Sequence, residues 1–200
     1  TYQPNYALAA HWTSDLNTAP SSPTRASVPS TEPLKSTEAK FQVSMRAKVV
    51  EGLLLPTADL WFAYTQRSLW QVWSRDESSP FRSTEYQPEA IYVLPLSGTI
   101  ARWPGGIRWE MLQFGVAHQS NGQSEPNSRS WNRVYASTTF TRGDWALTGT
   151  FNRRLHESDK DDNPDLTRYM GNTELRADWL PGVATTSLTW RRHNKTLGNG

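Results

Sequence analysis

The sequence predicts an all-β protein, a transmembrane antiparallel β-barrel, and three observations support this prediction. Apolar and polar residues alternate with a period of two over segments longer than the ~5–6 residues usual in soluble sheets. One of the two alternating faces carries charged residues. Only 36% of the residues are hydrophobic, yet 12% are aromatic and ten are Trp. That composition is typical of barrels with a polar lumen and aromatic girdles at both membrane interfaces.

The alternation is clearest in the segment 41–49. Apolar residues occupy the odd positions from Phe41 to Val49, and polar or charged residues occupy the even positions from Gln42 to Lys48. Successive side chains of a strand point to opposite faces. The segment is therefore predicted to be a strand between an apolar and a wet environment.

A charged face in the segment 169–179 separates the barrel from a soluble β-rich binding protein. Glu174, Arg176 and Asp178 share one face there. The inner faces of a sandwich must be dry, whereas the lumen of a barrel can be polar. We therefore favour the barrel.

The whole chain can be interpreted as about nine such strands. They are expected near 2–12, 40–52, 58–71, 89–103, 107–120, 131–143, 144–156, 169–181 and 182–194. Short connections alternate with long ones, which is typical of outer-membrane barrels. A change of phase at Met111–Leu112 predicts a β-bulge or the end of a turn. Because bacterial barrels usually have an even number of strands, we expect residues 1–200 to form one barrel domain that ends before the barrel closes.

Several other classes are disfavoured by composition. The longest apolar runs are far shorter than the ~18–20 residues of a membrane-spanning helix. The chain has no cysteine, which excludes disulfides and cysteine metal sites. Its 21 basic and 19 acidic residues are mixed along the sequence. We therefore expect no nucleic-acid partner.

A polar pair continues the apolar face of the strand 107–120. His118 and Ser120 follow Phe114 and Val116 on that face, with their Cα atoms ~6.6 Å apart. If Ser120 pairs with Ser130 across the following loop, antiparallel register places His118 opposite Asn132. A hydroxyl, an imidazole and an amide would then converge, which is the arrangement of a serine hydrolase. The alternative is a set of interfacial polar residues bonded to headgroups or water.

The loop after Ser120 adds two features. Gly122 offers an unobstructed backbone N–H near the hydroxyl, which suits an oxyanion. Ser124, Glu125 and Ser128 offer hard oxygen ligands of the kind that calcium prefers.

The same region resembles a known family. The segment 118-HQSNGQSEPNSRSWNR-133 is similar to the active-site region of the outer-membrane phospholipase A family. So are 64-YTQRSLWQ-71, 77-ESSPFRSTEYQPE-89 and 161-DDNPDLTRYMG-171. The resemblance extends over nearly the whole chain and implies a twelve-stranded barrel in the outer membrane of a Gram-negative bacterium. It also implies a calcium-dependent enzyme that hydrolyses acyl ester bonds of glycerophospholipids.

The resemblance implies a role for each residue of the catalytic group. Ser120 is the expected nucleophile, and His118 is the expected general base and acid. Asn132 is expected to orient the imidazole, and the backbone N–H of Gly122 to stabilise the oxyanion.

The resemblance also implies a calcium site and a homodimer favoured by Ca²⁺. Ser78, Gln123 and Ser128 match calcium ligands, although Gln123 replaces an arginine often found in the family. Gln66 matches a lipid-side residue that pairs across the dimer interface. The competing interpretation is a non-enzymatic, porin-like or structural barrel, which explains the alternation but not the three converging polar groups.

Overall fold

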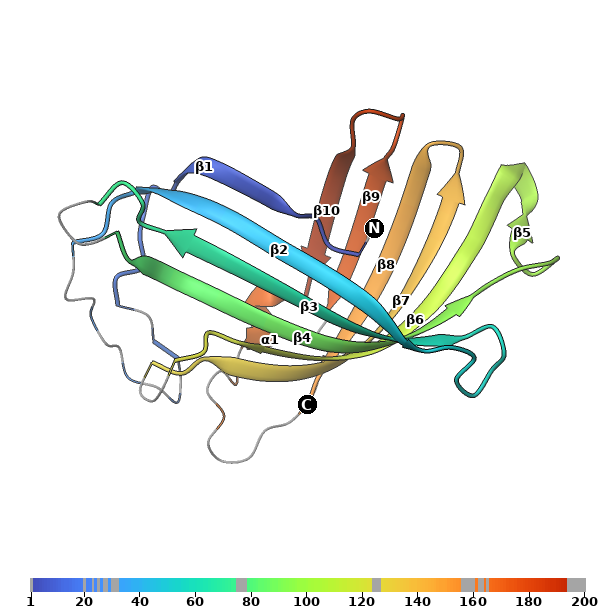
Figure 1. Ribbon diagram of the computed structural model, residues 1–200, viewed down its shortest axis with the longest axis horizontal. Helices are drawn as coiled ribbons and strands as arrows, with labels where there is room; N and C mark the ends of the chain where they lie inside the picture. The colour runs from blue at the N-terminus through green and yellow to red at the C-terminus, as the bar shows by residue number, and fades with distance from the viewer. Residues whose placement is uncertain are drawn as a thin grey trace.

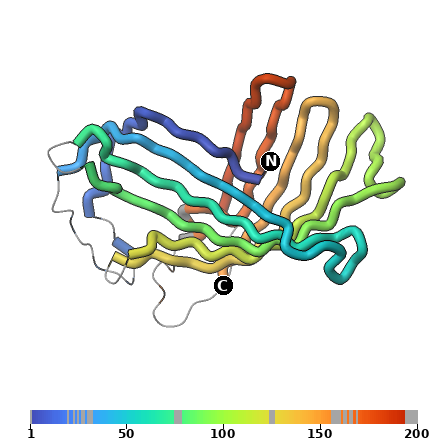
Figure 2. The backbone as a smooth tube through the Cα atoms, viewed as in Figure 1, coloured from blue at the N-terminus to red at the C-terminus, as the bar shows by residue number. Residues whose placement is uncertain are grey.

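The computed structural model describes residues 2–19, 21, 22, 24, 26, 29, 33–74, 79–123, 127–155, 161, 164 and 166–193. Their strands form one large, strongly curled antiparallel sheet (Figures 1 and 2). The strands are β1 (Tyr6–Trp12), β2 (Thr37–Val50), β3 (Asp59–Trp70), β4 (Phe81–Pro95), β5 (Arg102–Trp103), β6 (Ile107–Ser120), β7 (Ser130–Arg142), β8 (Trp145–Arg154), β9 (Thr173–Trp179) and β10 (Thr186–Arg192).

The strands pair as a meander. Neighbours in the sheet follow chain order from β1 to β10, except that the short β5 pairs only with the start of β6. Within the described residues, the edge strands β1 and β10 do not pair with each other. No helix in the part of the chain described here is long and apolar enough to cross a membrane.

The two faces of the sheet differ as the alternation predicts. On the outer face, large apolar side chains are about half exposed, including Met45 (59%), Phe114 (50%) and Val116 (52%). On the inner face, polar side chains are buried, including Gln42 (3%) and Glu89 (4%). A sheet that exposes its apolar face and buries its polar face is suited to lipid outside and a polar lumen inside.

The charged side chains predicted on the inner face near the end of the chain form ion pairs. Glu174 accepts a hydrogen bond from Arg191 at 2.6 Å, and Asp178 accepts one from Arg176 at 2.8 Å. These pairs lie within and between β9 and β10. The charges therefore stabilise one another on the lumen side.

Several predicted strand boundaries are wrong. β1 begins at Tyr6. Before it, the Pro4 carbonyl accepts a hydrogen bond from Gln42 Nε2, and Asn5 Oδ1 accepts one from the backbone N–H of Ser44. β4 begins at Phe81 and ends at Pro95, so the predicted strand 89–103 is displaced. The predicted strand 169–181 begins at Thr173, because Leu166–Met170 form the short helix α1.

The predicted bulge is present. The register between β6 and β7 shifts between Trp109 and Met111. The shift returns Leu112 and Phe114 to the outer face. It therefore sets the phase of the strand that ends in His118 and Ser120.

Candidate active site

The β6–β7 hairpin places the predicted catalytic residues in register. His118 is the Cα partner of Asn132, and Ser120 is the partner of Ser130. Beyond them, the Asn121 N–H donates to the Arg129 carbonyl at 3.0 Å. Hydrogen-bonded and non-hydrogen-bonded pairs alternate along an antiparallel ladder, so His118 and Asn132 form a non-hydrogen-bonded pair, in which side chains approach most closely.

The two side chains use this proximity. His118 Nδ1 lies 2.8 Å from Asn132 Oδ1. An amide oxygen can only accept a hydrogen bond, so Nδ1 carries the proton. The second ring nitrogen, Nε2, is then left with its lone pair and can act as a base.

Ser120 shares the outer face with this pair but does not bond to it. Among the described residues, no hydrogen bond joins the side chains of Ser120 and His118. Such contacts are often long in the absence of substrate. Ser120 also lies in one row of the sheet with Tyr86 of β4 and Gln66 of β3.

Gly122 adopts a backbone conformation that favours glycine. Its φ is +66°, in the left-handed region that favours glycine. A Cβ at this position would lie 2.7 Å from Cε2 of Tyr86. The ring of Tyr86 therefore packs directly against the glycine backbone, and only glycine fits without a shift of that ring.

The predicted calcium ligands are partly described. Gln123 is exposed, and the carbonyl of the half-buried Ser128 accepts a hydrogen bond from Arg129 Nη1 at 2.7 Å. Ser78, Ser124 and Glu125 lie outside the described residues. Gln123 and Ser128 offer carbonyl and hydroxyl oxygens at one end of the hairpin, which are hard ligands that fit Ca²⁺. In the part of the chain that the structure describes, no cluster of His, Asp and Glu forms a metal site.

Gln66, the predicted dimer residue, lies on the outer face of β3. Its Oε1 accepts a hydrogen bond from the Tyr64 hydroxyl at 3.1 Å, and its Nε2 donates to Ser68 Oγ at 3.4 Å. A polar ladder thus lies on the face that the alternation assigns to lipid. Polar side chains in such a place stabilise association when they bond across an interface.

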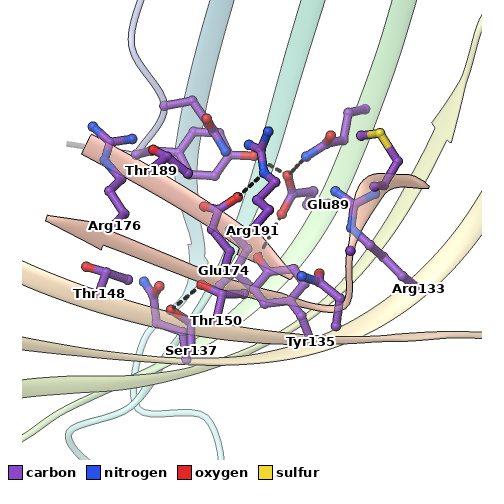
Figure 3. Close-up of a pocket in the computed structure, with 18 of the residues that line it drawn as sticks. Glu89, Arg133, Tyr135, Ser137, Thr148, Thr150, Glu174, Arg176, Thr189 and Arg191 are labelled. Carbon is purple, nitrogen blue, oxygen red and sulfur yellow. Dashed lines mark hydrogen bonds and ion pairs between the residues drawn. The ribbon is translucent and has the colours of Figure 1, made fainter. Parts of the chain in front are cut away.

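A polar cluster that includes Glu89, Arg133 and Tyr135 lines a pocket on the inner face of the sheet (Figure 3). Glu89 accepts hydrogen bonds from the hydroxyls of Tyr2 at 2.5 Å and Tyr135 at 2.7 Å, and another from Gln87. Burial, and then the negative charge of Glu89, raise the pKa of Tyr2 far above its usual value. Tyr2 therefore stays a neutral donor.

This cluster is directly behind the catalytic candidates. Glu89 pairs with Ala117, and Ala117 pairs with Arg133. Ala117 and Arg133 are the sequence neighbours of His118 and Asn132, so this inward-facing row lies one residue along the strands from the catalytic candidates. Arg133 stacks on the Trp131 ring, with its Cζ 4.6 Å from the ring centroid. These inward-facing side chains thus make contacts on the inner face of the strands that carry His118 and Asn132.

The sequence reasoning did not identify Tyr86, Glu89 or Asn121 as parts of the site. Asn121 had a signal, because an Asn before a Gly at a strand end is typical of a turn made by the Asn side chain. Tyr86 and Glu89 had none, since their contacts depend on the pairing of β4 with β6.

Solved structures of outer-membrane phospholipases are similar to this chain in overall fold. Outer membrane phospholipase A from Escherichia coli has a similar structure, with a TM-score of 0.80 and 32% identity over 98% of this chain and 72% of that one. A Salmonella typhi outer membrane phospholipase dimer with bound calcium also gives a TM-score of 0.80, with 32% identity over 96% of this chain and 71% of that one. Another matching structure, again from Escherichia coli, is an active-site mutant with an asparagine changed to alanine.

Proteins related to this chain in sequence are also phospholipases. A putative phospholipase A1 from Neisseria meningitidis is 38% identical over 204 residues, covering all of this chain and 53% of that protein. Phospholipase A1 from Escherichia coli is 36% identical over 199 residues, covering all of this chain and 65% of that protein. The chain thus spans between half and two thirds of the length of these curated relatives. The model of the phospholipase A1 family matches residues 1–200, and the chain belongs to this family.

Proposed function

We propose that this protein is a calcium-dependent phospholipase of a Gram-negative outer membrane. It hydrolyses acyl esters of glycerophospholipids with Ser120, His118 and Asn132, and it is active as a homodimer. The observation that carries the proposal is the 2.8 Å contact between His118 Nδ1 and Asn132 Oδ1 on the apolar outer face. A bonded imidazole and amide, beside a serine and next to Val116, suit a substrate that arrives from lipid.

Acylation begins at Ser120. His118 Nε2 takes the hydroxyl proton while Oγ attacks the carbonyl carbon of the ester, and Asn132 holds the ring through its proton on Nδ1. The negative charge that develops on the carbonyl oxygen is stabilised by the backbone N–H of Gly122. The intermediate collapses when His118 returns the proton to the glycerol oxygen. A lysophospholipid leaves, and the acyl group stays on Ser120.

Deacylation repeats these roles with water. His118 removes a proton from water, the hydroxide attacks the acyl carbonyl, and the protonated imidazole then returns the proton to Ser120 Oγ. A fatty acid is released. Overall, one ester bond and one water molecule give one carboxylic acid and one alcohol.

Calcium fits the oxygen-rich end of this hairpin. We assign its ligands to Ser78, Gln123 and Ser128, and it would supply positive charge near the developing oxyanion. These groups are neutral oxygen donors, so one subunit alone should hold the ion weakly. A dimer that completes the site would couple metal binding to association, with Gln66 at the interface.

A porin-like barrel is the second candidate function. It needs an open lumen, whereas the described inner face is occupied by side chains that bond to one another, such as Glu89 with Tyr135. It also leaves the pairing of His118 with Asn132 without a role. The enzyme is therefore favoured.

The test is hydrolysis of a phospholipid by full-length protein in mixed micelles, with Ca²⁺ and with EDTA. Ser120→Ala should abolish turnover, and a sulfonyl fluoride should label Ser120 in the unmodified protein. Ser83→Ala is the matched control, because Ser83 lies on the neighbouring β4 at the same end of the sheet, and its alternation places it on the lumen face. Wild-type hydrolysis by Ser120→Ala would show that the nucleophile is assigned wrongly.

A further inference from the structure

The side chain of Asn121 closes the catalytic hairpin. At the next step of the ladder beyond Ser120 and Ser130, the backbone N–H of Asn121 donates to the Arg129 carbonyl. In an ordinary hydrogen-bonded pair, the N–H of residue 129 would donate back to the backbone carbonyl of residue 121. Here it donates to Asn121 Oδ1 instead, at 2.9 Å.

This exchange of acceptors redirects the chain. Because the side chain replaces the backbone carbonyl, the main chain leaves the ladder at Asn121 and turns into the left-handed conformation of Gly122. The same Oδ1 accepts a hydrogen bond from the N–H of Gln123 at 3.3 Å, which closes a turn around the glycine. Tyr86 packs against the glycine from the other side.

The other half of the amide reaches the far side of the loop. Asn121 Nδ2 donates to the carbonyl of Asn127 at 2.8 Å. One side chain therefore contacts the backbone at 123, 127 and 129, and these contacts bracket both Gly122 and Ser128. The oxyanion donor and two candidate calcium ligands are held by a single amide.

We propose that Asn121 is a positioning residue for the hydrolytic site, acting through the backbone of Gly122 and the backbone at residues 123, 127 and 129. This inference rests on the function proposed above. Asn121 itself touches no reacting atom; it fixes where the Gly122 N–H and the oxygens near Gln123 and Ser128 lie. The position of the oxyanion donor, the Gly122 N–H, and the positions of the candidate calcium ligands therefore depend on the same side chain.

The experiment compares Asn121→Ala and Asn121→Ser with Asn127→Ala in the full-length protein. Asn127→Ala is the matched control, because only the main-chain carbonyl of Asn127 is used and alanine keeps it. Asn121→Ala should lower kcat about 10–100-fold with little change in KM, since a misplaced oxyanion donor affects the transition state more than the bound ester. It should also raise the calcium concentration needed for half-maximal activity. Asn121→Ser should fall between, because a serine hydroxyl makes the same turn more weakly and does not reach Asn127.

A second readout does not depend on turnover. Hydrogen exchange of the Gln123 and Arg129 amides should be faster in Asn121→Ala, while exchange in the paired strands stays unchanged. Should Asn121→Ala fail to fold, Asn121→Ser decides: a reduced kcat with a raised calcium requirement supports the inference, and wild-type values overturn it.

The outcomes separate this inference from the proposed function. If Ser120→Ala is inactive but Asn121→Ala keeps the wild-type kcat and calcium dependence, only the role of Asn121 is wrong. If wild-type protein does not hydrolyse phospholipid, or if Ser120→Ala does so at the wild-type rate, the function fails and the role of Asn121 fails with it.

Discussion

At the scale of single residues, the partner of His118 is an amide rather than a carboxylate. An ionised carboxylate on a face that meets lipid would lose its hydration, which is costly unless the charge is fully paired. Asn132 Oδ1 fixes the ring through the 2.8 Å contact without carrying a charge. The site thus keeps the orienting hydrogen bond and avoids the desolvation penalty.

This division of roles predicts unequal losses of activity. His118→Ala removes the proposed base and should lower kcat about 10³-fold or more, whereas Asn132→Ala removes only the proposed orienting contact and should cost about 10–100-fold. Steady-state hydrolysis of a short-chain phospholipid measures both. Equal losses would mean that Asn132 does more than orient the ring.

Gly122 gives a second prediction, with Gly98 as its control. Both have positive φ, +66° and +71°, but a Cβ at Gly98 would meet no atom within 4 Å. Gly98→Ala should therefore cost only backbone strain, about 1 kcal/mol of stability. Gly122→Ala adds the clash with Tyr86 and should remove most of kcat. Gly122→Ala and Gly98→Ala with the same activity would show that the Gly122 backbone is not part of the site.

At the scale of elements, the hairpin is braced from the lumen. The Tyr135 ring of β7 lies across Gly115 of β6, where an added Cβ would fall 2.2 Å from Tyr135 Cζ, and its hydroxyl reaches Glu89 of β4. Three strands are therefore joined by one side chain. Gly115 and Tyr135 each lie three residues along the chain from His118 and Asn132, respectively.

Gly115→Ala should displace that ring and break its bond to Glu89. We expect a loss of about 1–3 kcal/mol, as for other overpacked sites. Gly149→Ala is the control, because its Cβ would make only an ordinary 3.5 Å contact with Leu175. Urea unfolding of protein inserted in lipid vesicles measures both. Equal stability of the two variants would contradict the bracing role.

Elements differ in how far they can be predicted from sequence. Period-two alternation predicts β2, β6 and β7 closely. It also predicts the pairing of His118 with Asn132, because the apolar faces of the two strands must align across the loop that joins them. The start of β1 and the helix α1 could not be predicted this way. Tyr2 leaves the strand to bond with Glu89, which is 87 positions away in sequence, and no local pattern encodes such a contact.

At the scale of the whole molecule, the sheet has its polar side inside and its apolar side outside. Adjacent positions should then report opposite environments. A spin label at Phe114 should be accessible to oxygen in lipid, and one at Gln113 to an aqueous nickel complex, because neighbouring side chains of a strand point to opposite faces. A label at Phe114 that reports water would reverse the orientation of the sheet.

A charged residue in place of Val134 should lower the free energy of unfolding by about 2–4 kcal/mol if it lies near the membrane midplane.

Under the proposed function, the outward placement of His118 and Ser120 determines which phospholipid concentration controls the rate. A site that opens onto the hydrocarbon samples neighbours within a plane, so its saturation should follow the mole fraction of phospholipid around the protein rather than the amount per litre. Adding inert detergent at a fixed quantity of phospholipid should therefore slow hydrolysis by dilution within the surface. Adding water should leave the rate of each enzyme molecule almost unchanged.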